Sequence, residues 1–147
     1  MKNQNIVLIA IASALAFALA PVTQAASTPQ DYGPTITIQN AGNVLRGKTG
    51  SFVLNAIRPP PPLLFGGGVC VNFSVSGTAI PGADYVALVS PAYIGQSGYG
   101  VISVATLPDP RGPFDRQAYS VVVTLEPGAG YVVGEPASAQ MWIKPTR

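Results

Sequence analysis

The alternation of apolar and polar residues is clearest over residues 69–76. Val69, Val71, Phe73 and Val75 alternate with small or polar residues, so an extended chain has one apolar face here. A period of two residues is typical of a β-strand with one buried face. We therefore predict a central strand, followed by a turn over 77–85, where two glycines and a proline favour a tight connection.

Shorter segments of similar character recur along the chain. We predict further strands over 34–39, 51–57, 86–89, 92–94, 101–107, 119–125 and 137–143. Phe52, Leu54 and Ala56 lie on one face of the 51–57 strand, and Ile102 and Val104 are expected to point inward. Turns rich in glycine and proline separate these segments, and no helical pattern follows the N-terminal 25 residues. The pattern predicts an all-β fold, an immunoglobulin-like antiparallel β-sandwich of about seven strands, because a parallel sheet would need helical crossovers.

The N-terminus is predicted to be a signal peptide covering residues 1–25. Lys2 precedes an apolar run over 6–20, and small residues stand before Ala26, where a signal peptidase would cleave. The run is shorter than the ~20 residues that span a bilayer, so we expect no membrane span after cleavage. The expected organisation is a flexible lead over 26–33 and one domain over 34–147. The predicted location is periplasmic or extracellular.

Composition limits the chemistry that this chain can perform. Its 147 residues suffice for one domain with one core, and only 10% are charged, which argues against nucleic-acid binding. The chain has no histidine, so the commonest general base and metal ligand is absent. We predict a protein that is not an enzyme, although the sequence leaves a pair of catalytic carboxylates open.

The single cysteine, Cys70, excludes an intramolecular disulfide. It is expected to be a partly buried thiol, with an intermolecular disulfide as the alternative.

Two groups of residues resemble a known family. Residues 71–79 (VNFSVSGTA) and 81–85 (PGADY) resemble the core signature of Calx-beta domains, and 121–125, 128–134 and 136–139 resemble the last two strands of that family. The resemblance extends over about 34–143. It implies an immunoglobulin-like sandwich in which acidic loops at one end hold calcium. Family members include the calcium-sensing segment of sodium/calcium exchangers and many bacterial surface proteins.

Alternating strands would bring the loops near 46–50, 77–84 and 108–116 to one end of the sandwich, where the family places its ions. The candidate calcium ligands there are Asp84, Asp109 and Asp115. Residues 116–119 align with an acidic run of calcium binders but contain no carboxylate. The same loops carry four cations: Arg46, Lys48, Arg111 and Arg116. Because calcium needs ~6–8 oxygen ligands, we predict that calcium binding is weak or lost and that no cofactor is needed.

A structural role is the simpler interpretation of these carboxylates. Asp84 is expected to bond the backbone of its own turn, and the 109–115 loop to pair internally with Arg111 and Arg116. The alternative is a calcium-binding adhesion or matrix module that uses the three aspartates.

The loops near 59–68, 95–100 and 126–135 would share the opposite end. Four prolines there precede Leu63, Leu64 and Phe65, which are expected to lie near Tyr99 and Tyr131. These five residues form a candidate contact surface for a protein or cell-surface partner. The simpler interpretation is that the three loop residues cap the core.

The function predicted from the sequence is that of an exported, non-catalytic binding or scaffolding module. A second alternative is a self-assembling structural subunit that joins through its first and last strands as free edges. Pro34 and Pro136 work against such pairing. The sequence does not specify the oligomeric state.

Overall fold

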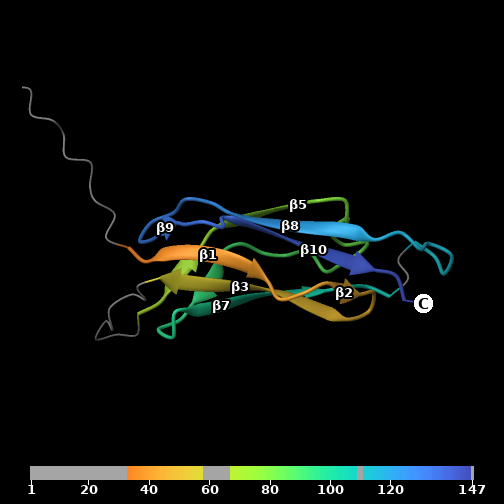
Figure 1. Cartoon of the computed structure of the whole chain (residues 1–147), viewed down its shortest axis with the longest axis horizontal. Helices are drawn as coiled ribbons and strands as arrows, with labels where there is room; N and C mark the ends of the chain where they lie inside the picture. Colours follow the sequence, from red (N-terminus) through yellow and green to blue (C-terminus); the bar gives the residue numbers. More distant parts are fainter. Residues whose placement is uncertain (1–32, 58–66, 109–110, 147) are drawn as a thin grey trace, which may run out of the picture.

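The computed structural model describes residues 33–57, 67–108 and 111–146, and over these the protein is all-β. Figure 1 shows the strands running along the long axis of the molecule. The ten strands are β1 (Thr35–Asn40), β2 (Val44–Leu45), β3 (Thr49–Ile57), β4 (Val69–Val71), β5 (Phe73–Ser76), β6 (Ala92–Ile94), β7 (Tyr99–Ala105), β8 (Tyr119–Leu125), β9 (Val132–Val133) and β10 (Ser138–Lys144). Residues 1–32, with the expected signal peptide and most of the expected lead, lie outside the described ranges.

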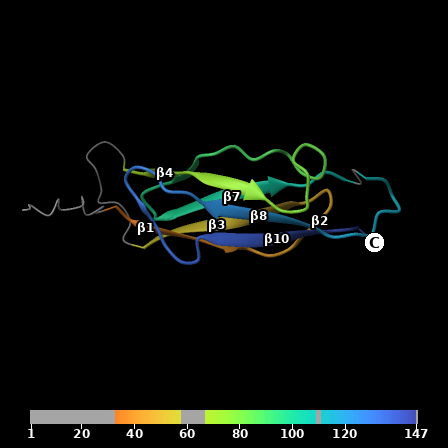
Figure 2. The ribbon, with the colours of Figure 1, turned by 90° about the horizontal axis from the view of Figure 1, so that it is seen from above.

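The strands form a sandwich-like arrangement of two larger sheets and a small one. One sheet has the order β7-β3-β1-β9, the other β2-β10-β8-β5, and β4 pairs with β6. The two four-stranded sheets lie against each other, as Figures 1 and 2 show, and β1 contacts β10 between them. The coarse prediction of an all-β, sandwich-like fold is confirmed.

The alternating apolar residues account for the core between the sheets. In β7, Val104 is completely buried and Ile102 nearly so, as predicted. In β3, Phe52 and Leu54 are completely buried, whereas Ala56 on the same face is partly buried. The opposite sheet contributes the buried residues Phe73, Val121, Val123, Leu125, Met141 and Ile143. One continuous apolar layer therefore joins the two sheets.

The central segment does not form one strand, so this prediction is wrong. β4 pairs with β6, whereas β5 pairs with β8, and Asn72 lies between them. The backbone N–H of Asn72 donates to the hydroxyl of Tyr131 (2.9 Å), and its carbonyl accepts from the N–H of Glu126 (2.9 Å). Val69, Val71 and Phe73 are all buried despite the change of sheet. The period of two continues through the break, so the pattern could not reveal it.

The predicted strand over 86–89 is also absent. The N–H of Val86 donates to the carbonyl of Ala105 (2.9 Å), but no strand follows. Val86 and Val89 are largely exposed. Residues 86–89 are all apolar and do not alternate with polar residues, so the sequence does not indicate which face of this segment is buried.

The first and last strands are not sheet edges, which corrects the basis of the self-assembly alternative. β1 lies between β3 and β9, and β10 lies between β8 and β2. β9 and β2 are two residues long and pair in parallel with their neighbours, so the strictly antiparallel prediction fails at these two places. Short outer strands of this kind offer little backbone to another chain.

Cys70 lies on the face of β4 opposite Val69 and Val71, as predicted, but it is exposed and not partly buried. Within the described ranges, no helix has the length and hydropathy needed to cross a membrane.

Candidate functional site

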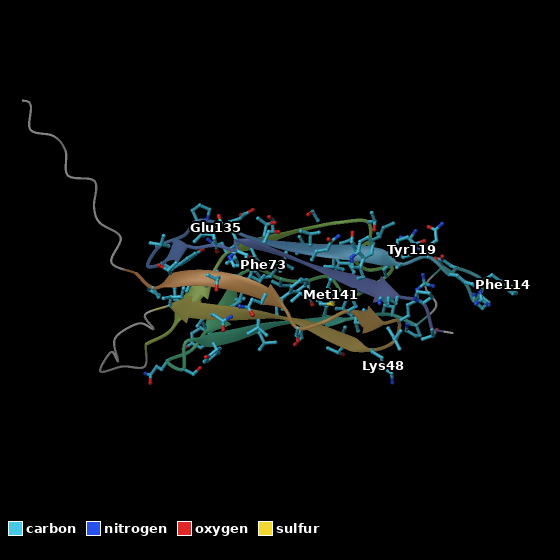
Figure 3. All side chains as sticks on the ribbon, in the orientation of Figure 1. Lys48, Phe73, Phe114, Tyr119, Glu135 and Met141 are labelled. Carbon is cyan, nitrogen blue, oxygen red and sulfur yellow. The ribbon has the colours of Figure 1, made fainter. Side chains whose placement is uncertain are left out.

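Three loops meet at one end of the sandwich, which we call the arginine end. It comprises Arg46, Asp84, Arg111, Asp115 and Tyr119. Arg46 follows β2, Asp84 lies between β5 and β6, and the other three lie between β7 and the start of β8. Tyr119 marks this end in Figure 3. The predicted meeting of the three loops is confirmed by ion pairs between them, whereas Asp109 lies outside the described residues.

Asp84 is a buried carboxylate with a full set of partners. Its Oδ2 accepts a hydrogen bond from the backbone N–H of Ile80 (2.7 Å), which confirms the predicted bond within its own turn. The Arg111 guanidinium donates to both carboxylate oxygens, from Nε to Oδ1 (2.9 Å) and from Nη2 to Oδ2 (2.7 Å). This two-point geometry is the strongest form of an arginine–carboxylate pair. The Arg111 hydrogen bonds hold the pKa of Asp84 below its ordinary value.

Asp115 is engaged in a different way. Its Oδ1 accepts from the backbone N–H of Gln117 (2.9 Å), and its Oδ2 accepts from the Tyr119 hydroxyl (2.9 Å) and from Arg46 Nη2 (3.0 Å). The Gln117 N–H, followed by the Tyr119 and Arg46 hydrogen bonds, lowers the pKa of the Asp115 carboxyl. The predicted pairing of Arg111 inside its own loop is wrong, because Arg111 reaches Asp84 and Arg46 reaches Asp115.

Arg46 is almost completely buried and joins the end of β2 to the loop that precedes β8. Besides its bond to Asp115 Oδ2, it donates to the backbone carbonyls of Asp115 (2.8 Å) and Gln117 (3.0 Å). These carbonyls have left the sheet ladder and would otherwise lack partners in the interior. The guanidinium therefore satisfies the loop backbone as well as a carboxylate.

Tyr119 connects the two ion pairs. The Arg111 guanidinium carbon lies 4.0 Å from the centre of its ring, and that of Arg46 lies 5.6 Å away. Both distances fall within the range of cation–π attraction. Burial and the hydrogen bond to Asp115 raise the pKa of the Tyr119 hydroxyl. A continuous chain of contacts therefore runs from Asp84 through Arg111, Tyr119 and Asp115 to Arg46.

The described carboxylates of the arginine end are already occupied by hydrogen-bond donors. Calcium would need several oxygens converging on one point, but the oxygens of Asp84 and Asp115 already accept hydrogen bonds from arginine, tyrosine and backbone donors. The two carboxylates are linked through Arg111 and Tyr119 and do not face a shared gap. Within the part of the chain that the structure describes, no group of three acidic, histidine or cysteine side chains converges on a metal position.

The opposite end differs from the predicted contact surface. Tyr99 is exposed, as a contact residue requires, but Tyr131 is only 2% exposed. The Tyr131 hydroxyl donates to the carbonyl of Glu126 and accepts from the N–H of Asn72. Tyr131 therefore fixes the corner before β9 and does not offer a side chain to a partner. Leu63, Leu64 and Phe65 lie outside the described residues.

Sequence reasoning missed the contacts of Tyr119 and the exposure of Phe114. The sequence pattern predicts Tyr119 only as the start of a strand and as the last residue of 116–119, although its place four residues after Asp115 is a usable signal for contact. Phe114 is 90% exposed in the loop beyond β7. An aromatic residue next to a proline, within a loop rich in charged residues, was the available signal.

Comparison of the chain with known proteins finds neither a matching family model nor a matching curated protein.

Proposed function

We propose that this protein is an exported, non-catalytic module with a Calx-beta-like, immunoglobulin-like sandwich. It binds or scaffolds other components at the cell envelope or outside the cell. In this proposal its loops are held by arginines, so it works without calcium.

The observation that carries the proposal is that both carboxylate oxygens of Asp84 and of Asp115 already accept hydrogen bonds from protein donors. Arg111 and Arg46 supply positive charge at the loop end where the resembling family places ions. A guanidinium joined to a carboxylate at two points fixes loop geometry without a metal.

The same contacts support a non-catalytic role. A catalytic acid usually has a pKa raised toward the working pH, because it must be protonated before it can donate. Both carboxyls at the arginine end instead have a lowered pKa, caused by Arg111 for Asp84 and by the Gln117 N–H for Asp115. They remain charged at neutral pH and act as hydrogen-bond acceptors.

Thermal unfolding with and without calcium tests the proposal. We expect millimolar calcium or a chelator to leave Tm unchanged, with magnesium at equal ionic strength as the control. Affinity capture from envelope fractions should retain the same binding partners in calcium and in chelator.

The calcium-binding adhesion alternative makes the opposite prediction. If calcium raised Tm markedly and Asp84→Ala abolished the rise, the proposal would be wrong. A partner held only in the presence of calcium would also contradict it.

A further inference from the structure

A projecting loop carries the most exposed large apolar side chain among the described residues. Phe114 is 90% exposed. It follows Pro113 and directly precedes Asp115 and Arg116, in the connection between β7 and β8. Figures 1 and 3 show this loop reaching beyond the ends of the strands, with Phe114 at its outer extreme. A single exposed ring is common on protein surfaces, so its meaning depends on the groups around it.

Charge is unevenly distributed among the described residues. All five described cations lie at or beside the arginine end: Arg46, Lys48, Arg111, Arg116 and Lys144. Asp84 and Asp115 are the described carboxylates there, so the described residues of this end carry a net charge of +3 (five cations and two carboxylates). Glu126 and Glu135 lie toward the other end, where Figure 3 labels Glu135.

The exposed cations at this end are distinct from those that hold the loops. Arg46 and Arg111 are committed to Asp115 and Asp84. Lys48, Arg116 and Lys144 are exposed, and none of them forms an ion pair within the described ranges. Because the two aspartates are already paired with Arg46 and Arg111, they do not compete with an external anion for these three cations.

Apolar surface accompanies these cations. An open, mostly apolar hollow of about 680 Å³ lies at the same end, lined by Leu45, Ala118, Lys144, Pro145 and Thr146. Leu45 itself is 47% exposed. The end therefore combines a projecting aromatic ring, exposed cations and accessible apolar surface.

We propose that the arginine end docks reversibly on an anionic lipid bilayer. Phe114 enters the interface between headgroups and acyl chains, while Lys48, Arg116 and Lys144 face the anionic headgroups. Aromatic rings favour this interface, and long cationic side chains can reach the headgroups from beside it. The proposal depends on Phe114 and exposed cations, and it does not depend on whether calcium binds.

A bilayer fits this surface better than a second copy of the chain. Phe114 is at a convex tip, which a deformable surface can accept without a matching pocket. The competing occupant is the glutamate-bearing end of another molecule, which would give concentration-dependent chains of copies.

Co-sedimentation with vesicles tests the proposal. The protein from Ala26 onward is used, because it retains every described strand and the whole described core. We expect binding to phosphatidylcholine vesicles that contain phosphatidylglycerol, little binding to phosphatidylcholine alone, and weakening by salt. Phe114→Ser should lower the partition coefficient about tenfold. Lys48→Gln and Arg116→Gln should each lower it about fivefold.

The matched control is Tyr93→Ser, which removes an exposed aromatic ring from β6, outside the arginine end, and should leave binding unchanged. Phe114→Ser should keep the native Tm, since the ring is exposed. Equal binding to both kinds of vesicle overturns the proposal. So does binding that needs the cations but not Phe114, because it indicates electrostatic adsorption alone. If the protein sediments without vesicles, and does so more at higher protein concentration, the arginine end mediates self-association and the membrane proposal is overturned.

Discussion

At the residue scale, Arg46 and Arg111 stabilise the same end of the molecule by different means. Arg111 is partly exposed, and its guanidinium donates hydrogen bonds to both oxygens of the buried Asp84 carboxylate. Arg46 is buried and divides its donors between Asp115 and two backbone carbonyls. A lysine could supply the charge at either position, but it lacks the planar set of donors that these contacts use.

The lowered pKa values of Asp84 and Asp115 predict how stability depends on pH. Both groups have a folded pKa below the ordinary value of 3.8, because Arg111 and the Gln117 N–H, respectively, favour the charged form. The unfolded chain therefore binds more protons near pH 4, so this stabilisation is complete above about pH 5 and is lost as the pH falls through the folded pKa values. Thermal unfolding followed across pH should show Tm declining only on the acidic side.

Asp84→Asn isolates one of the two groups. We expect the variant to lose about 2 kcal/mol of unfolding free energy at pH 7, because a charged hydrogen-bond acceptor is removed. The difference from the native protein should shrink as Asp84 becomes protonated in acid. Glu135→Gln is the control, since Glu135 is exposed and forms no ion pair with the described residues. A difference that grew as the pH fell would contradict the assignment.

At the scale of elements, the turn after β5 is attached to β8 through Ser120. The Ser120 carbonyl accepts from the N–H of Ala79 (2.9 Å), and its hydroxyl accepts from the N–H of Thr78 (3.1 Å). The Ser120 N–H in turn donates to the Thr78 hydroxyl (2.8 Å). Gly77 begins this turn with φ of 120°, and a Cβ there would overlap the Ser120 carbonyl. These contacts explain why the turn uses glycine at 77 and how Thr78 and Ala79 attach it to β8.

Gly77→Ala should destabilise the protein by about 3 kcal/mol, because it combines an unfavourable φ with a clash against backbone. Gly82→Ala is the matched control. Gly82 also has a positive φ (80°), but a Cβ there would meet nothing within 4 Å, so we expect a loss of about 1 kcal/mol. Urea denaturation of both variants gives the comparison. Equal losses would show that the contact with Ser120 is unimportant.

Much of the fold followed from the sequence, because burial leaves a period of two in strands such as β3, β7 and β8. The change of sheet at Asn72 was not predictable in this way, since the side chains keep alternating while the hydrogen-bond partners change. The meeting of the three loops followed from counting strands. The partners of Arg46 and Arg111 could not be predicted in this way. A long flexible side chain can reach several acceptors, and which one it binds depends on where the folded loops lie. Tyr131 was predicted to be a contact residue, but it is buried. Its position in the sequence does not show whether a tyrosine ring is exposed or is buried with its hydroxyl bonded to the backbone.

At the scale of the whole molecule, stability depends on one core shared by two sheets. With a single cysteine, no intramolecular disulfide supports the chain. Ile36, Ile38 and Leu54 from one sheet and Val121 and Met141 from the other are completely buried. A substitution that weakens packing in one sheet should therefore also destabilise the other sheet.

This shared core predicts cooperative unfolding. Leu54→Ala in β3 should lower the unfolding free energy by about 3 kcal/mol through the cavity it leaves. Trp142, the only tryptophan, lies in β10 of the other sheet and should report the same loss by fluorescence as circular dichroism reports for all strands. Val101→Ala, at an exposed position of β7, should change stability by less than about 0.5 kcal/mol. Two separate transitions in the native protein would contradict a single core.

The placement of β1 and β10 inside their sheets has a mechanical consequence. The described chain begins before β1 at one end of the long axis and finishes after β10 at the other, as Figure 1 shows. A pull applied at these two points would run parallel to both strands. The six residue pairs that join β1 to β3 would then share the load and slide together, and they would not peel apart one at a time. Such shear geometry predicts resistance to a pull along the long axis.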